Sequence, residues 1–179
     1  MSEDQSSRIW IMRGWFVVLG LATLFIHLLP LSAMSRPWAT PDLMLGFAFA
    51  WSVRKPVYVP VILLGLMLLL SDLLLQRPPG LWAFLGLLCC ENLQSRAKRL
   101  RASNFATEWA TVIAMLVGAT ILYRIILAIL LVEQPNLGSQ LIQTITTILY
   151  YPVIVFATHV LMGVRKGVPG DMDARGGRI

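Results

Sequence analysis

Long apolar runs separated by short polar breaks fill most of the chain. A membrane-spanning helix needs about 20 predominantly apolar residues, and six of the runs approach or exceed that length. Their period and length predict helices, and nothing in the pattern alternates as a strand does. The runs cover residues 9–31, 38–53, 58–75, 79–92, 107–131 and 138–164. We therefore predict an all-α integral membrane protein, with a six-transmembrane-helix bundle over residues 1–166 and a flexible tail over 167–179.

The breaks between the runs carry residues that end or start helices. Gln76-Arg77-Pro78-Pro79-Gly80 separates the third run from the fourth and predicts a very tight turn between two helices. At the start of the second run, Thr40 is placed to be the helix N-cap. Asp42 would then lie in the first turn, where a carboxylate suits the positive end of the helix dipole.

Composition agrees with a membrane protein. Hydrophobic residues make up 57% of the chain and charged residues 13%, with a mean hydropathy of +0.72. A soluble domain could not cover that much apolar surface, and the length leaves no room for a separate soluble domain. The chain is basic, with a pI near 9.9, but its basic residues cluster beside the apolar runs. That distribution argues for membrane topology and against nucleic acid as a partner.

The distribution of Lys and Arg predicts the orientation of the bundle. Twelve of the 15 lie at the N-terminus, in the second and fourth breaks and in the tail, while two lie in the first and third breaks. Cytoplasmic loops of membrane proteins carry the excess of positive charge. Both termini are therefore predicted to be cytoplasmic.

Two ionisable residues lie within the apolar runs, at similar predicted depth. Asp72 lies about 21 Å along the third helix and Arg124 about 25 Å along the fifth, at about 1.5 Å per residue. An unpaired charge there costs on the order of 3 kcal/mol, so we expect the two side chains to pair, with Asp42 as the competing partner of Arg124. In the alternative, Arg124 reaches the outer headgroups and Asp72 caps the turn.

The sixth run carries a polar stripe. Its members recur at helical spacing and lie within about 40° of one line, at about 100° per residue; they are Gln140, Thr144, Thr147, Tyr151 and Thr158. Thr120 shares the face of Arg124 one turn earlier. These groups could bond to neighbouring helices, or they could line an outward cavity or a groove for a partner helix.

The fourth break is a basic surface. Its cations, Arg96, Lys98, Arg99 and Arg101, can bind anionic headgroups or an acidic cytoplasmic partner. Glu91 and Glu108 flank it, where neutralising contacts are expected. Cys89 and Cys90 are adjacent and predict small buried side chains, and neither His27 nor His159 has a second metal ligand at helical spacing. No catalytic motif is present, so we expect no enzyme, no cofactor and no metal.

Two short motifs resemble the bacterial rod-shape-determining membrane protein family MreD. The first is a helix ending in Ser71-Asp72-Leu73-Leu74-Leu75, followed by Pro78-Pro79-Gly80-Leu81 and Ala83. The second, Pro41-Asp42-Leu43-Met44-Leu45, is similar to the family's opening of the second span. Gln76-Arg77 stands where the family pattern leads us to expect glycine.

The resemblance implies a non-enzymatic scaffold of the elongasome in the bacterial inner membrane. It would bind the bitopic protein MreC and help couple MreB filaments to the polymerase RodA and its transpeptidase. The implied fold resembles the substrate-binding components of energy-coupling-factor transporters, so a role in vitamin-type solute transport is the alternative. Membrane lipids would surround the bundle. The candidate partner-groove or intramembrane polar residues are Asp42, Asp72, Arg124, Thr147 and Tyr151.

Overall fold

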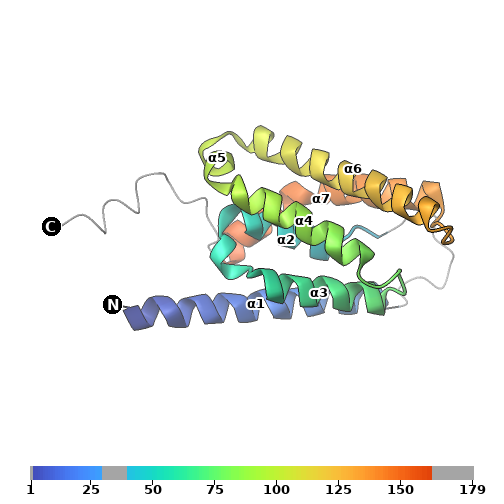
Figure 1. Ribbon diagram of the computed structural model, residues 1–179. Helices are drawn as coiled ribbons and strands as arrows, with labels where there is room; N and C mark the ends of the chain where they lie inside the picture. The colour runs from blue at the N-terminus through green and yellow to red at the C-terminus, as the bar shows by residue number, and fades with distance from the viewer. Residues whose placement is uncertain (1, 30–39, 163–179) are drawn as a thin grey trace.

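The chain folds into a bundle of α-helices (Figure 1). The structure, a computed structural model, describes residues 2–29 and 40–162, and this part of the chain contains no strand. The predicted tail 167–179 lies outside the described residues, as do residues 30–31, 38–39 and 163–164 of three predicted runs. The helices are α1 (Ser2–Leu28), α2 (Leu43–Arg54), α3 (Val61–Leu74), α4 (Leu81–Ser95), α5 (Ala97–Ala102), α6 (Phe105–Ile129) and α7 (Leu137–Met162), with a 3-10 turn at Pro56–Tyr58.

Three of these helices are long and apolar enough to cross a membrane. They contain the stretches Ile9–Leu28 in α1, Phe105–Ile129 in α6 and Leu137–Val160 in α7. Large apolar side chains point outward from all three, among them Phe25, Ile125, Ile129, Leu141, Leu149 and Phe156. A soluble fold would bury such side chains, whereas lipid is a suitable solvent for them. Over the described residues the all-α prediction is confirmed, and three helices, rather than the predicted six, meet this criterion for a membrane span.

Helix α2 forms the centre of the bundle. Its 12 residues cover only about 18 Å, well short of a bilayer core. Ten of them are nevertheless buried, because α1, α4 and α7 pack around this helix. Gly46 lets α7 approach closely, since a Cβ there would lie 2.5 Å from Cδ1 of Ile154. A helix enclosed in this way meets protein rather than lipid, so its length is not set by the bilayer.

Helices α3 and α4 form a hairpin around the predicted tight turn. α3 ends at Leu74, and Gln76 adopts a left-handed conformation with φ 54°. The backbone N–H of Arg77 donates to the carbonyl of Asp72 at 3.0 Å, which ends the helix in the manner of a Schellman motif. This conformation favours glycine, and it falls where the family pattern led us to expect one. Gly80 takes the second left-handed position, at φ 89°.

The basic segment predicted as a loop instead contains a short helix, α5. Ala97 and Leu100 are buried against the bundle, whereas Arg96, Lys98 and Arg99 are exposed. Arg101 turns inward and donates to the backbone carbonyl of Arg54 at 3.3 Å. Two apolar residues three positions apart give this segment an inner face, which explains why it is helical and packed.

Candidate functional site

A cavity of about 700 Å³ opens where six helix ends meet at one end of the bundle. α1, α3 and α6 end there and α2, α4 and α7 begin there (Figure 1). Most of its lining side chains are polar or aromatic, although the surrounding helices are strongly apolar. Its lining residues include Asp42, Arg77, Trp82, Tyr123, Gln140 and Gln143. We call this site the polar cavity.

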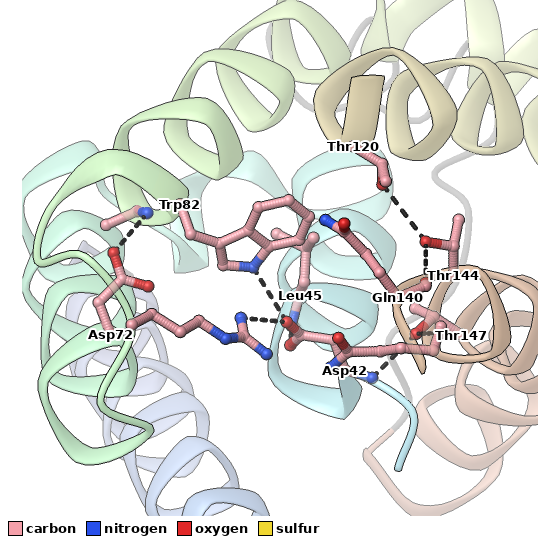
Figure 2. Close-up of polar contacts among 11 residues, drawn as sticks. Asp42, Leu45, Asp72, Trp82, Thr120, Gln140, Thr144 and Thr147 are labelled. Atoms are coloured by element: carbon pink, nitrogen blue, oxygen red, sulfur yellow. Dashed lines mark hydrogen bonds and ion pairs between the residues drawn. The ribbon is translucent and has the colours of Figure 1, made fainter. Parts of the chain in front are cut away.

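Asp42 connects three parts of the cavity wall (Figure 2). Its Oδ1 accepts from the backbone N–H of Leu45 at 3.1 Å, so Asp42 is itself the N-cap of α2, and the prediction that Thr40 caps this helix is wrong. Its Oδ2 accepts from Arg77 at 3.3 Å and from the indole N–H of Trp82 at 3.0 Å. These contacts join α2 to the α3–α4 hairpin.

Thr147 fixes the backbone of Asp42 from α7. The backbone N–H of Asp42 donates to Oγ1 of Thr147 at 2.8 Å, and that hydroxyl donates to the carbonyl of Gln143 at 2.7 Å. One turn earlier on α7, Thr144 is hydrogen-bonded to Thr120 of α6 at 3.3 Å. Two of the polar residues singled out in the sequence, Asp42 and Thr147, are thus brought together at the cavity.

Asp72 caps a helix other than its own. Its side chain is fully buried, and Oδ2 accepts from the backbone N–H groups of Gly80 at 3.1 Å and Ala83 at 2.9 Å (Figure 2). Those N–H groups belong to the first turn of α4, where no preceding residue of the helix can satisfy them. Asp72 therefore supplies the cap that Gly80, at the N-cap position, lacks.

The predicted ion pair between Asp72 and Arg124 is wrong, and so is the competing pair with Asp42. The guanidinium of Arg124 instead donates to Gln140 at 2.6 Å, Gln134 at 2.7 Å and the carbonyl of Pro135 at 3.2 Å. Arg124 thus extends toward the exposed α6–α7 turn, while Asp72 caps α4. The capping role of Asp72 agrees with the alternative stated from the sequence, whereas contact of Arg124 with the outer headgroups stays a prediction.

Tyr151 lies away from the polar cavity, contrary to its place in the predicted groove. Its hydroxyl donates to Glu108 at 2.8 Å, deep between α6 and α7. Glu108 also accepts from Arg54 at 2.5 Å, with the side chains of Arg54 and Glu108 only 4% and 0% exposed. Tyr151 therefore belongs to a buried network at the other end of the bundle. Arg54 supplies a neutralising contact for Glu108.

Four cavity residues were not predicted from the sequence: Arg77, Trp82, Tyr123 and Gln143. Arg77 and Trp82 flank the Pro-Pro-Gly turn, and Tyr123 sits one residue before Arg124. The guanidinium of Arg77 stacks 5.6 Å from the Trp82 ring centroid, and Trp82 meets Tyr123 edge-on at 5.3 Å. The sequence did contain a signal for Arg77 and Trp82, because both lie beside the Pro-Pro-Gly turn and within ten residues of Asp72.

The described residues contain no group of three His, Cys, Asp or Glu side chains placed to hold a metal ion. Cys89 and Cys90 are both free thiols there, and Cys90 is buried. The cavity wall instead offers amides, hydroxyls, the rings of His27, Trp82 and Tyr123, and the ion pair of Asp42 with Arg77. Such a wall can bind a molecule by hydrogen bonds and aromatic contact.

A double-mutant cycle should separate the observed ion pair from the predicted one. Asp42→Asn and Arg77→Gln are expected to show a coupling energy of about 1 kcal/mol, because the two side chains are in contact and partly shielded. Asp72→Asn and Arg124→Gln should be additive within about 0.5 kcal/mol, since they share no contact. Unfolding in mixed micelles would measure both cycles, and coupling in the second alone would contradict the structure.

The fold and the site together define a helical membrane protein with a polar cavity at one end of its bundle. Neither protein-family models, nor curated proteins, nor solved structures gave a match to this chain. The features that bear on function are therefore the cavity, Asp42 and Asp72, and the sequence motifs around these two aspartates.

Proposed function

We propose that this chain is an MreD-like scaffold of the elongasome in the bacterial inner membrane. In this role it binds MreC and helps couple MreB filaments to RodA and its transpeptidase during rod-shaped growth. The proposal rests on one observation: the two motifs that resemble the family lie in contact with each other in the fold. Asp42 and Asp72, 30 positions apart, both cap helices around one turn, and Asp42 contacts Arg77 and Trp82 of that turn.

The proposed architecture is six spans with both termini in the cytoplasm. α2, α3 and α4 are the short spans. A short span is tolerated here because these helices pack against the three long ones. Among the described residues, a group of cations lies at the end of the bundle opposite the polar cavity, which supports an outward-facing cavity; it comprises Arg54, Lys55, Arg96, Lys98, Arg99 and Arg101. A reporter fused at Ile179 should be active in the cytoplasm, whereas one inserted at Asn136 should be active outside. The reverse pattern would overturn the orientation.

The form of the cavity favours a scaffold over a solute carrier. Gln76, Gln134, Asn136 and Ser139 line it and are exposed, so the cavity formed by residues 2–29 and 40–162 has a wide mouth. Small-molecule sites bury about 70–90% of their ligand, which an open mouth does not achieve without closure. A polypeptide that enters from outside needs no closure. The cavity volume of about 700 Å³ does lie within the range of small-molecule sites, so a vitamin-type solute remains the second candidate.

Affinity purification of the tagged full chain from gently solubilised native membranes tests the proposal. An MreC-like bitopic protein recovered in near-equal amount supports a scaffold. Recovery of an ATPase module without any wall-synthesis protein would replace the scaffold with a transporter. Thermal stability gives a matched control, because a scaffold should be stabilised by its partner's membrane helix and a solute carrier by a small molecule.

A further inference from the structure

The α6–α7 side of the polar cavity carries hydrogen-bonding groups that the protein does not use. Within the described residues, neither the side-chain amide of Gln143 nor the hydroxyl of Tyr123 has a hydrogen-bond partner, and both residues line the cavity. Gln134 and Gln140 give their amide oxygens to Arg124, which leaves their NH₂ groups free to donate. These groups are accessible from the cavity, so they are available to an occupant that enters from its mouth.

The charges of the cavity select an uncharged occupant. The carboxylate of Asp42 is already shared by Arg77, Trp82 and Leu45. Arg124 is surrounded by three oxygen acceptors, and Glu133 at the mouth carries the opposite charge. A charged ligand would have to break one of these arrangements, whereas a neutral polar ligand can use the free amides and hydroxyl.

Side-chain amides match the peptide group closely. Glutamine offers one carbonyl acceptor and two N–H donors, the same kinds of group that a polypeptide backbone presents. The interior turns of a partner helix within the membrane already satisfy their own backbone groups, so they have none to offer. A non-helical segment at the end of that helix does have them. Trp82, with Leu75 and Leu116, provides the apolar wall against which such a segment can pack.

We propose that the polar cavity receives a short, uncharged, non-helical segment of the partner chain, adjoining the outer end of its membrane helix. Gln140 and Gln143 hydrogen-bond to the backbone of that segment, and Tyr123 adds a further donor. This inference rests on the proposed scaffold function, and it states where and by what chemistry the partner is held.

Site-specific photo-crosslinking in native membranes tests the inference. Benzoylphenylalanine is placed at Gln143 in the full chain, with Leu149 as the control, since Leu149 lies on the same helix and is 61% exposed on its outer side. Position 143 should crosslink to the bitopic partner, and mass spectrometry should map the adduct to residues next to the partner's membrane helix. Position 149 should not give that adduct.

The possible failures are distinguishable. If the partner is co-purified but position 143 crosslinks to its membrane helix, or to nothing, the backbone-segment inference is overturned while the scaffold function stands. A small-molecule adduct at position 143 would also overturn it and would favour a solute site. If no bitopic partner is recovered at all, the scaffold function fails, and the inference fails with it.

A substitution of similar size provides an independent measurement. Gln143→Leu removes the amide but keeps most of the volume, and the amide has no protein partner to leave unsatisfied among the described residues. We expect partner recovery to fall about fivefold to tenfold, consistent with the loss of one or two hydrogen bonds. Leu149→Ala should leave recovery unchanged. Equal recovery with Gln143→Leu would overturn the assigned role of this amide.

Discussion

Replacing Arg54 with methionine is expected to lower the free energy of unfolding by about 3–5 kcal/mol, because it leaves Glu108 as a buried carboxylate without its cation. Arg54 reaches both carboxylate oxygens, at 2.5 and 3.5 Å. The side chain of Glu108 is completely buried between α6 and α7. Unfolding in mixed micelles, followed by circular dichroism, gives the measurement.

The double variant Arg54→Met/Glu108→Met is the control for this pair. Removing both charges together replaces a buried ion pair with two apolar side chains of similar length, which is often close to neutral in other proteins. We therefore expect the double variant to recover most of the lost stability, short of the hydrogen bond that Tyr151 gives to Glu108. If the double variant loses as much as the two single variants combined, the residues do not act as a pair.

The class of fold could be predicted because it depends on local pattern. Long apolar runs with few charges specify membrane helices whatever their neighbours are, and three of the helices meet the criterion on length and hydropathy. The special turn at residues 76–80 was also visible, since Pro and Gly restrict the backbone locally. The left-handed conformation of Gln76 was not visible, because a glutamine residue does not itself indicate a left-handed conformation.

The ion pairs could not be predicted, because depth along a helix does not determine direction around it. Asp72 and Arg124 were placed at similar depth, yet Asp72 faces α4 and Arg124 faces the α6–α7 turn. Arg54 and Glu108 are separated by 54 positions and lie on helices whose contact the sequence does not specify. Helical spacing has a similar limit. Tyr151 shares the stripe of Gln140 but lies 11 residues further on, about 16 Å along the axis, and so in another network.

The second large effect is expected at Asp72. Replacing it with alanine should lower the free energy of unfolding by about 2–3 kcal/mol, because the N–H groups of Gly80 and Ala83 lose their shared acceptor. Asp72→Asn keeps an oxygen that can accept from both, so its loss should be about half as large. Arg124→Ala removes contacts at an exposed turn and should cost less than about 1 kcal/mol. Equal losses at Asp72 and Arg124 would instead favour a direct partnership between them.

Asp72 is also expected to position the cavity wall, although it is not among the lining residues. The turn that it caps contains Arg77 and leads directly into Trp82, and both contact the carboxylate of Asp42. In the Asp72→Ala background, the coupling energy between Asp42 and Arg77 should therefore fall toward zero, because the turn is no longer fixed against α4. The same cycle in the Arg124→Ala background should keep its value of about 1 kcal/mol. An unchanged coupling in Asp72→Ala would show that the turn is held by its prolines alone, so that Asp72 stabilises α4 without positioning the cavity.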